Sequence, residues 1–103
     1  QLVFNSDGLI PTIAQEKSTN EILMMAYSNK NSIEMTVKTK KAHFWSRSKK
    51  KLWQKGETSG NKLNIINIYT DCDSDALIYE VELEGIGACH TGKKSCFYKK
   101  LEL

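Results

Sequence analysis

Two short stretches of this chain concentrate side chains that bind metal ions. Residues 71–75 alternate aspartate with cysteine and serine, and residues 89–96 begin and end with cysteine. Together they contain all three cysteines of the chain. Zinc prefers thiolate ligands, whereas hard ions such as magnesium prefer carboxylate oxygens. These residues predict a metal centre, and we expect the chemistry of the protein there.

The order of residues within 71–75 predicts two sites rather than one. If this stretch continues a β-strand, successive side chains point to opposite faces. Asp71, Asp73 and Asp75 then share one face, and Cys72 points to the other. Carboxylates and thiol would serve different ions, magnesium and zinc respectively. The alternative is a solvated acidic turn, although three like charges this close repel one another without a cation between them.

The cysteine spacing differs from that of a closed structural zinc site. The cysteines are 17 and 7 residues apart, which fits neither a zinc ribbon nor a zinc finger. Structural sites usually have four protein ligands, whereas catalytic sites keep one position open for water. Three thiols therefore favour a catalytic zinc, unless His43 or His90 supplies a fourth ligand.

Length and composition limit the fold to one domain. The chain has 103 residues, of which 40% are hydrophobic, enough for a single core. No apolar run is long enough to span a bilayer and no signal-peptide pattern opens the sequence, so we expect a cytoplasmic protein with no membrane partner. A formal net charge of +3 and a pI near 8.8 fit a phosphorylated ligand as well as nucleic acid.

The elements that position these residues are expected to be short strands. Apolar and polar residues alternate most clearly at 77–84, directly after the aspartates. Further strands are expected at 2–4, 10–14, 21–27, 43–48, 52–55, 63–70 and 97–103, with a turn at 6–8, a loop at 56–61 and a bulge at Ile65 and Ile66.

One main helix is expected at about residues 30–40. Ser28 or Asn29 can cap its N-terminus, and lysines gather at its C-terminal end. Ile33 and Val37 are four residues apart, so they should form the buried face.

Several motifs, taken in order, are similar to those of a known family. The chain carries HFWSRS at 43–48, LWQKGETSGN at 52–61, DCDSDAL at 71–77 and ACHTGKKSCFY at 88–98. This succession closely resembles phosphoribosyl-AMP cyclohydrolase of histidine biosynthesis, and the match covers nearly the whole chain. The resemblance implies one domain over residues 1–103. It also implies an α+β fold of mostly antiparallel, twisted strands in an intertwined homodimer.

The resemblance further implies a zinc- and magnesium-dependent hydrolase. Its substrate would be phosphoribosyl-AMP, whose adenine ring is opened at the N1–C6 bond by zinc-activated water to give the phosphoribosyl-formimino-AICAR nucleotide. Six residues match the family's metal ligands: Cys72, Cys89 and Cys96 for Zn²⁺, and Asp71, Asp73 and Asp75 for Mg²⁺. The family places Cys72 across the dimer interface.

Other site residues are expected around these ligands. His90 adjoins Cys89 and is the candidate base, because protons must move as the ring opens; it could instead only orient the loop. Contacts to the nucleotide and its phosphates are expected from Trp45, Ser46, Arg47, Thr58 and Ser59. The lysine-rich turn at 49–51 is a variable stretch and is expected to matter little.

Two other classes of function remain open on the sequence alone. A zinc-stabilised nucleic-acid-binding module would use the basic and aromatic residues of 40–55. A metal storage protein or chaperone would exchange metal without a small-molecule pocket. The resemblance favours the enzyme and no nucleic-acid partner. In some organisms the family's domain is fused to a phosphoribosyl-ATP pyrophosphatase domain, so the sequence fits a complete protein or part of such a fusion.

Overall fold

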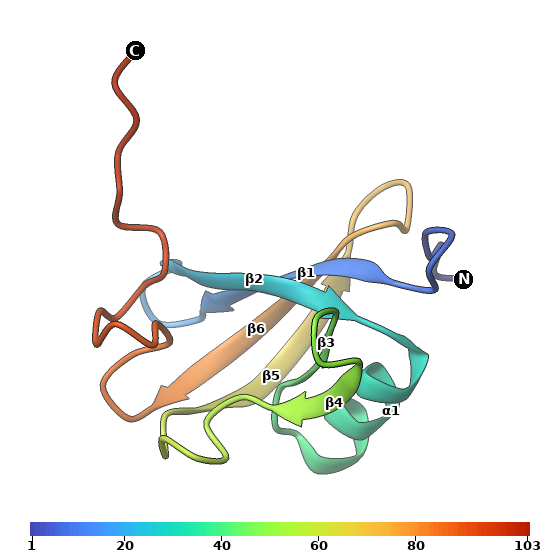
Figure 1. Cartoon of the computed structure of the whole chain (residues 1–103), viewed down its shortest axis with the longest axis horizontal. Coiled ribbons are helices and arrows are strands. Elements are labelled where there is room, and N and C mark those ends of the chain that lie inside the picture. The colour runs from blue at the N-terminus through green and yellow to red at the C-terminus, as the bar shows by residue number, and fades with distance from the viewer.

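The computed structural model describes residues 1–103 and contains one six-stranded sheet and one helix (Figure 1). The strands are β1 (Ile10–Glu16), β2 (Ile22–Ser28), β3 (His43–Ser46), β4 (Lys51–Gln54), β5 (Lys62–Thr70) and β6 (Leu77–Glu84), and the helix is α1 (Lys30–Thr39). The α+β class and the helix bounds are confirmed. With ten residues, α1 is too short to span a bilayer.

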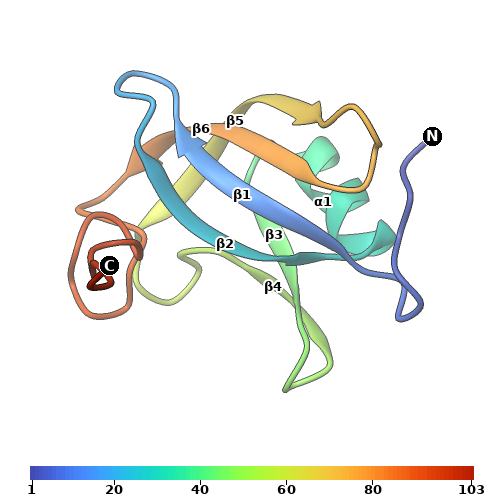
Figure 2. The same cartoon turned by 90° about the horizontal axis from the view of Figure 1, so that it is seen from above.

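The strands are arranged in the order β4-β3-β2-β1-β6-β5. Neighbouring strands are antiparallel except β1 and β6, which run parallel, so the expected mostly antiparallel sheet is confirmed. The sheet is strongly curved (Figure 2). Its two halves also meet through residues 40–42. Ala42 N donates to Leu63 O at 2.9 Å, and Ile65 N donates to Lys40 O at 2.8 Å, which ties the start of β3 to β5.

The core fills the inside of this curve. Its members with no exposed surface are Ile10, Ala14, Leu23, Ala42, Phe44, Leu63, Tyr79 and Val81. The Phe44 ring packs between Trp53 and Tyr79, with ring centroids 5.2 and 5.6 Å away. The Tyr79 hydroxyl lies 3.4 Å from Ser28 Oγ, which satisfies the polar end of this buried side chain.

Helix α1 begins with a capping box. Asn29 Oδ1 accepts from Ser32 N at 2.8 Å, and Ser32 Oγ accepts from Asn29 N at 2.9 Å, which confirms Asn29 as the cap. The expected apolar face is wrong in part, because Val37 is 49% exposed and the fully buried residues are Ser32 and Thr36. Thr36 Oγ1 accepts from His43 N at 2.9 Å, so a short hydroxyl side chain joins the helix to β3.

Three other predictions about the strands can be compared with the fold. The bulge is confirmed, because the register between β5 and β6 shifts between Ile65 and Asn67. The strands expected at 2–4 and 97–103 are wrong: neither segment forms a ladder in this chain, and Figure 1 shows the C-terminal segment extending away from the sheet.

Candidate metal centre and active site

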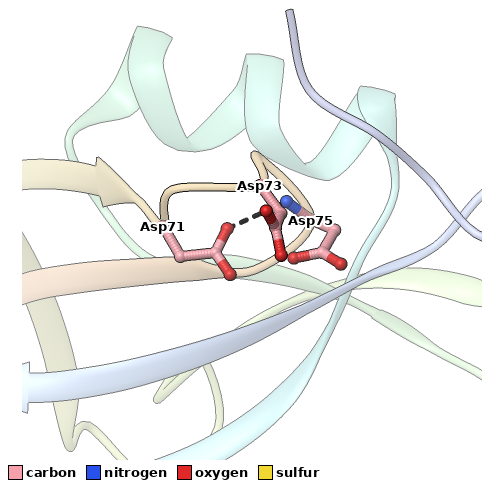
Figure 3. A group of neighbouring side chains, drawn as sticks. All are labelled: Asp71, Asp73 and Asp75. Carbon is pink, nitrogen blue, oxygen red and sulfur yellow. Dashed lines mark hydrogen bonds between the residues drawn. The ribbon is translucent and has the colours of Figure 1, made fainter.

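The three aspartates lie on a turn between β5 and β6, not on a strand. Strand β5 ends at Thr70, Ser74 has a positive φ of 59°, and Ser74 N donates to Asp71 O at 3.0 Å. Asp71 Oδ1 also accepts from Asp75 N at 3.0 Å. The expectation that strand alternation aligns the carboxylates is therefore wrong. The turn brings them together instead, since one oxygen from each lies within 4.8 Å of the others (Figure 3).

The electrostatics of this turn fit a divalent cation. Hydrogen bonding to the Asp71 side chain and repulsion from the Asp71 and Asp73 charges raise the pKa of Asp75. Desolvation acts to raise the pKa of Asp71, but hydrogen bonds from the backbone N–H groups of Asp75 and Ala76 and from the Asp75 carboxyl outweigh it, and the pKa is lowered. All three side chains are exposed and offer only oxygen atoms. This donor set suits Mg²⁺.

The loop after β6 brings two of the three cysteines together. Cys89 N donates to Lys93 O at 3.2 Å and Gly92 N to Cys89 O at 3.1 Å. A Cβ at Gly87 would lie 2.5 Å from Lys93 O, so the close return of the loop requires glycine there. The Cys89 and Cys96 side chains line the same hollow, and Cys89 Sγ lies 2.9 Å from Thr91 Oγ1.

The two thiols differ in acidity. Hydrogen bonds from the Thr91 side chain and backbone, with smaller contributions from Cys96 and the Lys55 charge, lower the pKa of Cys89. Desolvation of the Cys96 sulfur and the neighbouring Cys89 raise the pKa of Cys96, although that residue as a whole is exposed. The pKa values of the two thiols are thus shifted in opposite directions, so deprotonating one makes it harder to deprotonate the other. A thiophilic cation such as Zn²⁺ removes that resistance, so the donor chemistry fits zinc.

Cys72 does not join these thiols within one chain. It precedes β6 and is exposed in the aspartate turn, whereas Cys89 follows β6. The eight residues of β6 span roughly 25 Å at 3.3 Å each, and Figure 1 shows the two loops at opposite ends of the strand. Asp71, Asp73 and Asp75 form the only group of three or more acidic, cysteine or histidine ligands within one chain.

His90 lines two hollows of similar size. One, of about 490 Å³, is lined by His90 together with both thiols. The other, of about 520 Å³, extends from His90 to the β3–β4 hairpin. His43 is placed differently. It is buried, and its Nδ1 lies 2.8 Å from Lys41 O, so it does not complete a three-residue ligand set with the thiols.

The larger cavity contains some of the expected substrate contacts and not others. Ser46, Thr58 and Ser59 line it, whereas Trp45 and Arg47 do not. Trp45 and Ser46 are adjacent on β3, so their side chains point to opposite faces of the hairpin. The Arg47 guanidinium instead lies 4.0 Å from the centre of the Tyr27 ring.

Sequence reasoning missed several residues of this site. They are Lys49, Lys51, Trp53, Gln54, Lys55 and Glu57 on the walls of the larger cavity, and Thr91 beside Cys89. For Lys51 and Trp53 the signal was present, since alternation along β4 puts both on one face and Lys51 pairs with Ser46 across the hairpin. Lys55 follows the strand, so only the tertiary structure places its charge near the two thiols.

Comparison with known proteins identifies the family of this chain. A family model described as phosphoribosyl-AMP cyclohydrolase matches residues 24–98. A phosphoribosyl-AMP cyclohydrolase of Archaeoglobus fulgidus is 57% identical over 99% of this chain and 94% of its own length. One from Methanoregula boonei is 52% identical over 98% of this chain and 81% of its own length. The histidine biosynthesis bifunctional protein HisIE of Aquifex aeolicus is 51% identical over 99% of this chain, which covers 50% of that protein. This chain belongs to the phosphoribosyl-AMP cyclohydrolase family.

Proposed function

We propose that this protein hydrolyses the N1–C6 bond of the adenine ring in phosphoribosyl-AMP, as a step of histidine biosynthesis. The observation that carries the proposal is 57% identity to a phosphoribosyl-AMP cyclohydrolase over nearly the full length of both chains. The product is the ring-opened phosphoribosyl-formimino-AICAR nucleotide, formed by adding water across the broken bond.

Two groups of ligands would hold the metals. Cys89 and Cys96, together with Cys72 of the partner subunit, would bind Zn²⁺, and the aspartate turn would bind Mg²⁺. Zinc in an open site supplies a Lewis acid that makes water acidic enough to be a nucleophile near neutral pH. Within one chain the carboxylates and Cys89 lie at opposite ends of β6, so they cannot hold one ion together.

The chain's own residues would move protons and orient the substrate. C6 is electrophilic because N1 carries a second ribosyl group, and N1 must gain a proton as the bond breaks. His90 lies on the cavity wall next to Cys89, in a position to accept a proton from water and return it to N1. Trp53 offers an aromatic face to the purine in the same cavity, and Ser46, Thr58 and Ser59 offer hydroxyl donors.

A homodimer would complete the zinc site. Two thiols from one chain leave it short of a ligand, and Cys72 is too far away in the same chain to supply one. The segment after Cys96 supports a partner, because it leaves the sheet with Phe97, Tyr98 and Leu101 exposed by 62%, 45% and 83%. Apolar side chains on an extended segment are typical of chains that exchange segments in an intertwined dimer.

The test is a ring-opening assay. Protein loaded with zinc and magnesium should change the ultraviolet absorbance of phosphoribosyl-AMP with turnover, and should leave AMP, which lacks the second ribosyl group, unchanged. His90→Asn should slow ring opening by about 10²- to 10⁴-fold while keeping bound zinc. Metal-loaded wild-type protein that leaves phosphoribosyl-AMP intact would contradict the proposed reaction. A His90→Asn variant with the wild-type rate would contradict only the role of His90.

A further inference from the structure

The β3–β4 hairpin places two of three consecutive lysines on the wall of the larger cavity. Lys49 and Lys51 line the cavity, whereas Lys50 between them does not. Lys50 occupies the turn with a positive φ of 51°. Ser46 fixes this geometry, because it pairs with Lys51 across the hairpin and its Oγ accepts from Lys49 N at 3.2 Å.

The cavity is positively charged at this end. Neither Lys49 nor Lys51 forms an ion pair with a carboxylate of the chain, so both ammonium groups are free to meet an anion. Lys55 adds a third positive charge to the cavity, and Glu57 is the one acidic residue on its wall. A cavity with this balance and His90 on its wall favours a ligand with a negative group some distance from the reacting atoms.

We propose that Lys49 and Lys51 bind one of the two phosphate groups of the substrate. This proposal rests on the proposed function, because phosphoribosyl-AMP carries a phosphomonoester on each of its two riboses. Each such phosphate has a charge of about −1.5 to −2 near neutral pH. With the purine ring beside His90, one ribose phosphate extends along the cavity to the hairpin, where lysines act as point charges for it. The two lysines would thus be specificity-determining residues.

Steady-state kinetics with neighbouring lysines test the proposal. Lys49→Gln and Lys51→Gln should each raise KM for phosphoribosyl-AMP about fivefold, and the double variant more than tenfold, with kcat within about a factor of two. Lys50→Gln is the matched control, because it removes the same charge from the same turn outside the cavity, and its KM should stay within a factor of two. Added salt should raise KM of the wild type more than that of the double variant.

Binding measurements separate this proposal from the reaction itself. Calorimetric titration of metal-loaded protein with AMP, ribose 5-phosphate and adenosine requires no turnover. One of the two phosphate probes should bind about fivefold more weakly to each cavity variant, which identifies the phosphate, while adenosine binds equally to all variants. The proposal is overturned if Lys50→Gln raises KM as much as the other two, or if neither phosphate probe loses affinity. If ring opening is absent but a phosphate probe depends on these lysines, the proposed reaction fails and the phosphate site stands.

Discussion

The backbone amide of Cys96 donates a 2.7 Å hydrogen bond to the carbonyl oxygen of Leu23 on β2. This edge of β2 is free there, because β2 pairs with β3 only at Tyr27 and Trp45. Ser95 Oγ donates to the next carbonyl, Ile22 O, at 2.6 Å. A candidate zinc ligand is therefore positioned by a strand far away in the sequence, which gives the loop a rigid support.

The thiol loop makes the first prediction. Cys89→Ser and Cys96→Ser should each lose stoichiometric zinc and at least about a hundredfold in ring-opening rate, because a hydroxyl is a poor zinc ligand. Zinc content is measured by elemental analysis after gel filtration, and folding by circular dichroism. Either variant retaining both zinc and a near-normal rate would remove that cysteine from the ligand set.

The second prediction concerns the aspartate turn at 71–75. Asp73→Asn should require about tenfold more added magnesium for half-maximal activity while leaving zinc bound. The substitution removes one carboxylate but keeps the hydrogen bonds that Asp71 accepts, which shape the turn. Asp7→Asn is the charge-matched control, as Asp7 lies exposed in the turn at 6–8. Loss of zinc with an unchanged magnesium response would refute two separate sites.

The third prediction concerns the proposed dimer. Co-expressed Cys72→Ser and Cys96→Ser chains should recover about a quarter of wild-type activity, because about half of randomly paired dimers are mixed and each of these has one intact zinc site. Each variant expressed alone should be inactive. A purified mixed dimer without zinc or activity would mean that the site is assembled within a single chain.

The fourth prediction concerns the ion pairs of Lys94. Lys94 Nζ lies 2.7 Å from Glu16 Oε1 and 3.1 Å from Glu21 Oε1, which joins the thiol loop to the β1–β2 hairpin. Hydrogen bonding to Glu16 raises the pKa of Lys94, and hydrogen bonding to Lys94 lowers the pKa of Glu16. The stabilisation is therefore lost as pH falls through the lowered pKa of Glu16, below the ordinary glutamate value of 4.5. It is also lost as pH rises through the raised pKa of Lys94, above the ordinary lysine value of 10.5.

Urea unfolding of the metal-free protein across pH measures this effect. The loss of stability in Lys94→Met should be constant between about pH 5 and 10 and should shrink outside that window, while Lys94→Arg should preserve most of the stability. A loss that stays the same down to pH 3 would show that Lys94 contributes by packing and not by charge.

The fifth prediction concerns the two glycines of the loop at 56–61. Gly56 has a φ of +86°, and a Cβ there would lie 2.4 Å from the backbone oxygen of Asn61. Gly60 has a similar φ of +80° with nothing within 4 Å. Gly60→Ala should cost about 1 kcal/mol in the free energy of unfolding, from the left-handed backbone alone, and Gly56→Ala about 3 kcal/mol or more, together with weaker substrate binding. Equal costs would show that the loop moves to accept the new methyl group.

Local patterns were sufficient for much of the fold. Alternation at 77–84 predicted β6 with its bounds, and the apolar pair at 65 and 66 predicted the bulge in β5. Ser28 or Asn29 was predicted to begin the helix, and the structure selects Asn29; a cap can be predicted because it depends only on residues within one turn of it. The candidate metal ligands were also named from residue type and motif, since ligand chemistry belongs to the side chain itself.

Only the tertiary structure decided how these parts meet. The local sequence pattern did not show that residues 71–75 form a turn, because the turn depends on the pairing of β5 with β6. Nor did that pattern show that α1 buries Ser32 and Thr36, because the contact with β3 determines which face of the helix is buried.

The sequence by itself determined which residues have the chemistry of the family and on which short elements they lie. Whether those residues share a site depends on strand order and direction, and the sequence pattern of one strand carries no information about its neighbour. Cys96 is therefore fixed beside Cys89, while Cys72 lies at the far end of β6. The long-range hydrogen bonds of β2 and β6 determine these positions.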